Sequence, residues 1–409
     1  MRVLSLSLPL ALVLVGSPLL AQGEAVATRP ADGAQTVELS PAQAELLDLA
    51  FAAASTIPVD PHVKDRSRTQ EEVVVACLEL DQPDRALRYL KGIANWRKGA
   101  AYADVAFYLA QHDRLDEVPR LLDRARKVAE THAREPNAQE WRTDRIRAKI
   151  TRTHLSLGEL EAALAVGRGL EPSESATVEG AHVVYAEDVT LQEQMEQLDA
   201  MFATREFARI RAALATCIDL FGRHYDDPQD RKMVQDRVEN VITTMPAALR
   251  LDALMQLAGT SLELGDRSRA RHYLDSAHEI MPKLDWSVEY QVPVVARLAS
   301  LGHRAGDEQA AAGTARALEM YEADKEKVGK VFRAGVLREV AETYATMGDA
   351  SAALGVYWHA IEEGADNVNQ RPRAMDLAAT CASMARHNVA PDDELRERIL
   401  EIKAGLTGS

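Results

Sequence analysis

The segment Leu251–Pro282 contains the pattern that most constrains how this chain can fold. From Leu254 to Leu262, apolar residues recur every three or four positions, which places them on one face of a helix. Gly265-Asp266 then interrupts the helix, because glycine readily adopts the left-handed conformation that closes a helix and aspartate caps the next one. A second apolar stripe follows, and Met281-Pro282 ends it. We therefore expect two helices that pack on each other across a tight turn.

The same order of apolar face, turn and apolar face returns elsewhere in the chain. The other segments that show it are Ser67–Lys98, Gly99–Glu130, Asp144–Pro172, Val292–Glu322 and Ala334–Ala365. Each has a turn residue near its middle, either an aspartate or a glycine followed by an acidic residue. Six units with matching turns predict one repeat array rather than several globular domains.

Small residues such as Ala258 and Ala270 occupy the packing faces of the clearest unit, and an aromatic or leucine, an alanine and a proline follow. This order resembles the tetratricopeptide repeat, a helix pair of about 34 residues. The resemblance covers most of the chain after residue 66, with Leu254 and Leu337 where the family has a bulky aromatic, and with wider spacing between turns. It implies an all-α fold, a right-handed α-solenoid of stacked antiparallel helix pairs whose first helices line the concave side.

The N-terminus has the pattern of a secretory signal peptide over Met1–Ala21. Arg2 precedes an apolar stretch that is short for a membrane span, and Leu19-Leu20-Ala21 is an acceptable cleavage site. We expect an exported protein, periplasmic or secreted, with an uncleaved anchor as the alternative and no later membrane span. The excess of arginine over lysine and the abundance of alanine suggest a GC-rich bacterial genome.

These signals divide the chain into five parts. They are a signal peptide (1–21), a flexible tether with a short helix (22–65), N-terminal helical repeats (66–172), an irregular helical middle segment (173–250), and C-terminal repeats with a capping helix (251–404). The short helix, which begins at Ser40-Pro41, is expected to cap the first repeat, with partner binding as the alternative. Ile57–Arg68 is expected to be a connector. The middle segment is either a degenerate pair of units or a hinge.

Composition and motifs argue against several functions. A net charge of −15 excludes the basic footprint of a nucleic-acid-binding protein. No HExxH, paired CxxC, GxSxG, Walker or dinucleotide motif occurs, so we expect no catalytic residue, cofactor or metal. The three cysteines, Cys77, Cys217 and Cys381, are expected to be buried, unpaired and far apart in the array. The best local cluster of imidazole and carboxylates is the loop at His224–Asp227, which is most simply a solvated loop.

What remains is the concave surface. In the last three units, the non-packing positions of the first helices are expected to form a polar groove of mixed charge. The groove residues are Asp252, Met255, Glu263, Arg304, Arg338 and Glu342. The function expected is a non-enzymatic exported scaffold that binds a protein or peptide there. The alternatives are an accessory subunit of a cell-envelope enzyme or machine and, least favoured, an enzyme with a site near residues 224–231.

Overall fold

The structure, a computed structural model, describes residues 38–186, 189–204 and 206–406. Within these ranges the protein is all-α, with 19 α-helices, three short 3-10 helices and no strand. The α-helices are α1 (Pro41–Thr56), α2 (Val59–Glu79), α3 (Pro83–Leu90), α4 (Arg97–Gln111), α5 (Val118–Ala133), α6 (Glu140–Ser156), α7 (Leu160–Val166), α8 (Pro172–Tyr185), α9 (Leu191–Phe202), α10 (Phe207–Arg223), α11 (Pro228–Thr243), α12 (Ala247–Glu263), α13 (Arg267–Ile280), α14 (Val288–Arg304), α15 (Ala310–Asp324), α16 (Lys330–Thr346), α17 (Ala350–Ala365), α18 (Gln370–Arg386) and α19 (Asp393–Gly405). The 3-10 helices are η1 (Leu115–Glu117), η2 (Met281–Lys283) and η3 (Lys325–Lys327).

The helices alternate between two roles. The even-numbered helices from α2 to α16 each pack on the odd-numbered helix that follows, and we call the two members the A helix and the B helix. This alternation confirms the predicted repeat of helix pairs. It also runs through residues 173–250, where α8 to α11 form two further pairs, so the middle segment is a pair of degenerate units.

The turn between A and B is the most regular part of the unit. Gly265 and Gly348 have φ of +79°, and the aspartate that follows each of them caps the B helix by accepting a backbone N–H. Glycine pays no steric penalty in this left-handed region. Asp81, Asp113 and Asn388 occupy the same place with positive φ in units that lack the glycine. The predicted turn chemistry is confirmed.

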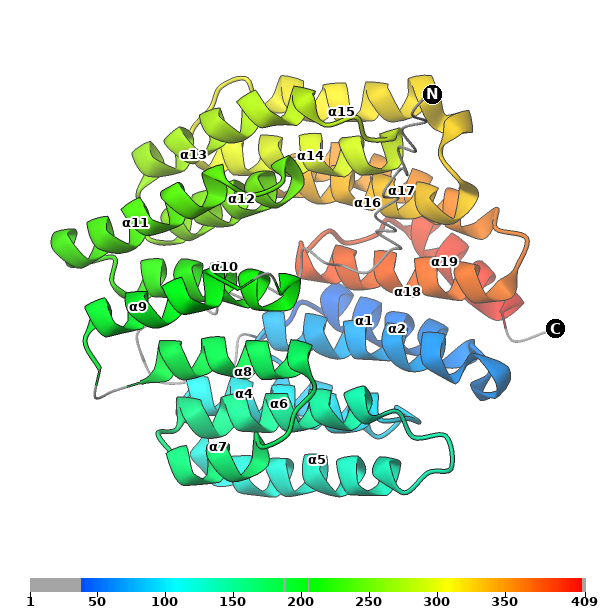
Figure 1. Ribbon diagram of the computed structural model, residues 1–409. Coiled ribbons are helices and arrows are strands. Elements are labelled where there is room, and N and C mark those ends of the chain that lie inside the picture. The colour runs from blue at the N-terminus through cyan, green and yellow to red at the C-terminus, as the bar shows by residue number, and fades with distance from the viewer. Residues whose placement is uncertain (1–37, 187–188, 205, 407–409) are drawn as a thin grey trace, which may run out of the picture.

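The array closes on itself. Each A helix packs on the next, from α2 through α18, and α18 in turn packs on α2. The N-terminal helix α1 packs on α18 as strongly as a B helix packs on its A helix, and so completes a ninth pair. Figure 1 shows α1 and α2, in blue, beside α18 and α19, in orange and red. Because neighbouring A helices contact one another while the B helices pack mainly on A helices, the A helices form the inner layer of a ring.

Polar contacts join the two ends of the chain at this seam. Ser40 Oγ donates to Asn388 Oδ1 at 3.2 Å, and Gln43 Nε2 donates to the Ala385 carbonyl at 2.9 Å. Arg396 makes a bidentate contact with Glu45, with Nη2 at 2.6 Å from Oε1. In the ninth pair, the left-handed turn residue Asn388 and the helix cap Ser40 therefore come from opposite ends of the chain.

The apolar core follows the same closure. Leu46 and Leu47 of α1 are essentially inaccessible to solvent and belong to one buried cluster with Leu377 and Cys381 of α18. A second cluster runs from α8 to α14. At the C-terminus, α19 packs on α17 and α18, with Leu395 and Ile399 buried.

Three expectations need correction. The connector predicted at Ile57–Arg68 is mostly part of α2, which begins at Val59. The short helix caps no open end, because α1 lies between α2 and α18. The helices that carry Cys77 and Cys381 are neighbours rather than distant, since the ring brings α2 beside α18, although both thiols are buried and free as expected. The predicted signal peptide, 1–21, lies outside the described residues.

Candidate functional site on the inner face of the ring

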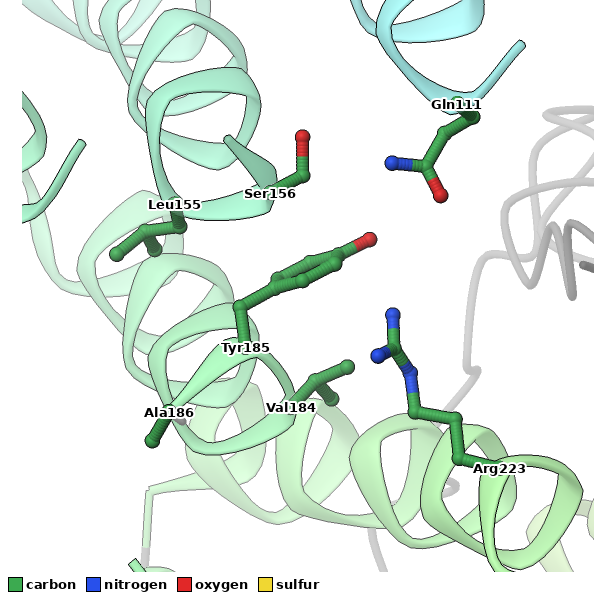
Figure 2. Close-up of a pocket in the computed structure, with 7 residues that line it drawn as sticks. All are labelled: Gln111, Leu155, Ser156, Val184, Tyr185, Ala186 and Arg223. Carbon is green, nitrogen blue, oxygen red and sulfur yellow. The ribbon is translucent and has the colours of Figure 1, made fainter. Parts of the chain in front are cut away.

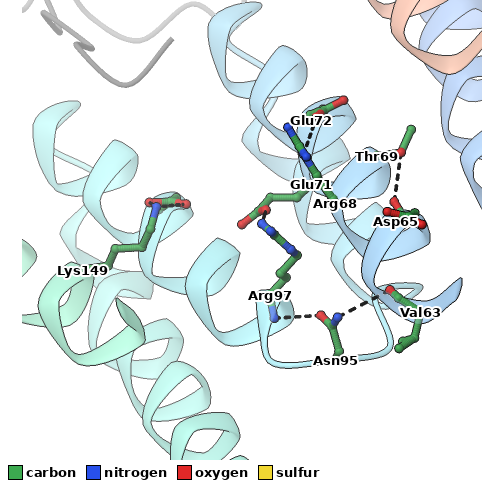
Figure 3. A network of polar contacts seen from close by, with 10 residues as sticks. Val63, Asp65, Arg68, Thr69, Glu71, Glu72, Asn95, Arg97 and Lys149 are labelled. Atoms are coloured by element: carbon green, nitrogen blue, oxygen red, sulfur yellow. Dashed lines mark hydrogen bonds and ion pairs between the residues drawn. The ribbon is translucent and has the colours of Figure 1, made fainter. Parts of the chain in front are cut away.

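The inner face of the ring is the side of the A helices that is turned away from the B helices, and it carries charged side chains that pair between neighbouring A helices. Lys149 Nζ of α6 donates to both carboxylate oxygens of Asp104 of α4, at 2.5 and 2.6 Å. Arg97 at the start of α4 pairs with Glu71 of α2. Figure 3 shows how these contacts link three successive A helices. Ion pairs between helices fix the spacing of the ring and leave a polar surface.

The same surface continues over α12 to α18, where the sequence predicted a groove. Asp252 is partly buried, and burial raises the pKa of its carboxyl group, an effect that Arg297 on the next A helix opposes. Glu263 and Arg304 are exposed at the ends of α12 and α14 and interact electrostatically. The structure thus brings these predicted residues together along neighbouring A helices.

Met255 does not belong to this surface. Its side chain is only 2% exposed and lies in the apolar cluster that runs from α8 to α14. An A helix of the ring is packed on a B helix and on two A neighbours, so its apolar stripe is wider than that of a helix with one buried face. The prediction that Met255 faces a groove is wrong.

Glu342 lies at the centre of the most concentrated charge cluster. Its carboxylate accepts a hydrogen bond from Ser383 Oγ at 2.6 Å, and Arg386 and His387 lie 3.7 and 3.9 Å away. Burial alone would raise the pKa of Glu342, but Arg386 and His387 keep it below its usual range. The pKa of the neighbouring Glu339 is raised to about 7, by burial first and by Glu342 second.

Arg338 faces the same region from α16. It interacts electrostatically with Glu72 of α2, Asp376 of α18 and both glutamates of its own helix. Its Nη1 atom is buried with no hydrogen-bond partner among the described residues. A buried donor without a partner is costly, and the neighbouring carboxyl groups of Glu72 and Asp376 offset that cost through their electrostatic attraction to the guanidinium.

A second polar region lies on the inner face at the C-terminal ends of α4, α6, α8 and α10. A pocket of about 310 Å³ is lined by Gln111, Leu155, Ser156, Val184, Tyr185, Ala186 and Arg223. Figure 2 shows the polar ends of Gln111, Ser156, Tyr185 and Arg223 turned toward a common space. The Arg223 guanidinium stacks on the Tyr185 ring, with its central carbon 4.5 Å from the ring centroid. This stacking holds a cation in a fixed orientation at the pocket.

The charge balance around this pocket is set by three residues. Asp219 lies one turn before Arg223 on α10, and burial raises the pKa of its carboxyl group to about 6, while Arg152 and Arg223 oppose that rise. The Arg152 guanidinium lies 3.8 Å from the Phe107 ring centroid. The Asp219 carboxyl group thus lies within electrostatic reach of two arginines, Arg152 and Arg223.

Sequence reasoning missed the pocket residues, because Gln111, Ser156, Tyr185 and Arg223 each stand on a different helix and share no spacing. One signal could have found them. Each lines the pocket from the last turn of an A helix, close to the chain's A–B turn. An alignment of the units on their turns would have placed them in one row.

The loop considered as an alternative site is used structurally. Asp227 caps α11 by accepting the backbone N–H groups of Gln229 and Asp230, at 2.8 and 3.0 Å. His224 Nδ1 lies 3.4 Å from Asp230 Oδ2. In the part of the chain that the structure describes, no group of three or more histidine, cysteine or carboxylate side chains is placed to hold a metal ion. Nor does any described helix have the length and apolarity needed to cross a membrane.

Comparisons with known proteins give little beyond the fold class. No known protein family matches the chain, and no curated protein is detectably similar in sequence. One solved structure to which the chain is similar is a circular tandem repeat protein with novel repeat topology and enhanced subunit contact surfaces. That match has 15% identity, covers 89% of this chain and 94% of the other, and has a TM-score of 0.27. A score this low establishes no shared fold, so the closure of the ring is argued from this chain's own contacts.

Proposed function

We propose that this protein is a non-enzymatic binding scaffold that holds a protein segment or peptide against the inner face of its helical ring. One observation carries the proposal: ring closure brings polar side chains from A helices far apart in sequence onto one concave surface. Many of these side chains are charged, with both signs interleaved. A surface of this kind recognises a polar peptide through several modest contacts rather than one deep pocket.

Arg338 and Glu342 illustrate how such a surface would bind. Arg338 is a partly exposed cation, and Arg386 and His387 keep the pKa of the Glu342 carboxyl group below its usual range. Hydrogen bonds to charged groups contribute about 1.5–3 kcal/mol each when they are shielded from water. Two or three such contacts, spread over neighbouring units, give appreciable affinity after the cost of ordering a peptide.

The proposal also includes the repeat class, the handedness and the export that the sequence predicts. We infer that the units are tetratricopeptide-like and right-handed, with repeats of wider spacing than usual. We also infer that the chain is exported after removal of residues 1–21. Export would deliver the ring to the periplasm or the exterior, and its ligand would then be an envelope or secreted protein.

The test is a pull-down with residues 22–409 from the envelope fraction of the host, followed by a binding measurement with the recovered partner. One variant replaces Arg304, Arg338 and Glu342 with alanine. A matched control replaces two arginines and one glutamate that are exposed on outer helices, namely Arg267, Arg316 and Glu319. Thermal melts establish that both variants are folded.

We expect the inner-face variant to lose the partner and the outer control to retain it, with the partner's affinity lowered at least tenfold. Equal retention by both variants would move the binding surface away from α14 and α16. Loss in the outer control alone would place it on the B helices, and the proposal would then be wrong.

An accessory subunit remains the second candidate, because one other feature favours a permanent partner. Large apolar side chains are exposed at the starts of several A helices, all at one edge of the ring: Val59, Phe207, Val331 and Val368, with Val368 86% exposed. An apolar edge suits a partner that offers its own apolar face. In that case a constant stoichiometric partner would survive the inner-face variant and dissociate when Phe207 and Val368 are replaced by serine.

A further inference from the structure

We propose that the pocket lined by Gln111, Ser156, Tyr185 and Arg223 binds a carboxylate group of the ligand. The inference rests on the proposed function, since the pocket lies on the inner face, but it concerns α4 to α10 rather than the predicted groove. Its basis is the arrangement of four polar groups around one cavity of about 310 Å³.

Charge gives the first reason. The chain as a whole carries a net charge of −15, yet the described residues that line this pocket include an arginine and neither aspartate nor glutamate. Arg223 is exposed, and its stacking on Tyr185 leaves the edge of the planar guanidinium available. A guanidinium edge matches the two oxygens of a carboxylate and can bind both at once.

The donors around the pocket give the second reason. The pocket lies at the C-terminal ends of four helices, where free carbonyl groups and the helix dipole oppose an anion, so a carboxylate is held there only by donors that offset this effect. Arg223 supplies a charge, and the Gln111 amide and the Tyr185 hydroxyl are further donors that point into the same space. The Ser156 hydroxyl already donates to the Thr153 carbonyl at 2.9 Å and contributes only polarity to the lining.

The rest of the lining limits what can accompany the carboxylate. Leu155, Val184 and Ala186 give the pocket an apolar side, and its volume is at the lower end of the range for small-molecule sites. This suits either the last residue of a peptide with a free C-terminus or a small dicarboxylic acid. Both have the same chemistry at Arg223, and the experiment distinguishes them.

The experiment measures binding of three probes to the purified protein by isothermal titration calorimetry. The probes are an acetylated alanine tripeptide with a free C-terminus, the same tripeptide with an amidated C-terminus, and succinate. The variants are Arg223→Gln, Arg223→Lys and Tyr185→Phe. The matched control is Arg316→Gln, because Arg316 is an exposed arginine on α15, a B helix away from the inner face.

We expect the free tripeptide, succinate or both to bind, and the amidated tripeptide to bind at least tenfold more weakly. Arg223→Gln should weaken binding at least tenfold and Arg223→Lys less, because lysine retains the charge without the planar fork. Arg316→Gln should bind as the unmodified protein does. Tyr185→Phe keeps the aromatic ring that stacks on Arg223 but removes the hydroxyl donor, so it should weaken binding only a few-fold. This variant provides a second test of the pocket if Arg223→Gln fails to fold.

Three results would overturn the inference. They are no binding of either carboxylate probe, equal binding of the amidated tripeptide, and unchanged binding in Arg223→Gln. If the probes bound but Arg316→Gln rather than Arg223→Gln lost binding, the pocket would be rejected, while the proposed function, which is tested with the natural partner, would survive. Loss of a natural partner in the outer control alone, together with probe binding that depends on Arg223, would give the opposite separation.

Discussion

Ser40 and Asn388 allow a direct test of ring closure, because they are 348 positions apart in the sequence and in contact in the structure. We predict that the double variant Ser40→Cys/Asn388→Cys forms an intramolecular disulfide on mild oxidation. The side-chain oxygens lie 3.2 Å apart, so the two segments are in contact, and motion of these surface residues can bring their Cβ atoms to the separation of about 3.8 Å that a disulfide needs. The three native thiols are buried and should not compete.

The expected gain in stability can be worked out from the length of the loop. In the chain-entropy model, a bridge that closes a loop of this length restricts the unfolded chain by about 6 kcal/mol. Two losses reduce the gain. Ser40 caps α1 by accepting the Gln43 N–H, and losing such a cap costs about 1 kcal/mol. Cysteine at position 388 must adopt a φ near +51°, which costs roughly 1 kcal/mol more. The oxidised variant should therefore be about 6 kcal/mol more stable than its reduced form, and about 4 kcal/mol more stable than the unmodified protein.

Non-reducing electrophoresis and urea denaturation of the oxidised and reduced forms provide the measurement. The oxidised chain should migrate as a compact monomer at every protein concentration. A control pair, Ser40→Cys with the exposed Ser173→Cys on α8, should not form an internal bridge. If the ends of the chain are apart in solution, the first pair will give only intermolecular disulfides whose yield rises with concentration, and the closed ring would be refuted.

Three further predictions concern stability. Burial raises the pKa of Asp376 to about 7, so between about pH 4 and 7 the folded protein binds a proton that the unfolded chain has released. Stability in urea denaturation should therefore fall as the pH rises from about 4 to 7, and Asp376→Asn should flatten that fall. A rise in stability over this range would contradict the prediction. Met255→Ala should lower the free energy of unfolding, measured in guanidinium, by about 2–4 kcal/mol, because its side chain is buried. Arg304→Ala, at an exposed position, should lower it by less than about 0.5 kcal/mol. A loss this small at Met255 would show that its side chain is not buried. Gly348→Ala should lower stability in thermal melts by about 1–2 kcal/mol, because Gly348 has a φ of +79°. Gly355→Ala, inside α17 with open space around it, should be neutral or stabilising. Similar effects of the two substitutions would argue against the left-handed turn at Gly348.

The repeat unit was predictable because its determinants are local. Gly265 and Gly348 end their helices by adopting a left-handed conformation, and the aspartate that follows each of them caps the next helix. Ser40 was recognisable as a helix start for the same reason, and it does cap α1. These signals require only the chemistry of a few adjacent residues.

Closure of the ring was not predictable, because it depends on the summed rotation of all the units. Each unit adds a small turn, and whether the last A helix meets the first is decided by packing that no single segment encodes. The seam contacts between Gln43 and Ala385 and between Glu45 and Arg396 have no sequence signature. The error at Met255 has a related origin, since Met255 is buried in an apolar cluster that several successive units, from α8 to α14, build together.

Closure also changes what the concave surface can do. In an open solenoid the groove has free ends, and a long partner can lie along it and extend beyond both. In a closed ring the inner face is bounded. A ligand must enter from one of the two edges, or the contact between α1 and α18 must open to admit it. Gln111, Ser156, Tyr185 and Arg223 meet at the edge where the A helices end, because successive A helices run in the same direction. A chain terminus that enters by this edge would reach Arg223 before any residue deeper on the inner face, so the ring favours ligands that present an end over those that present a loop.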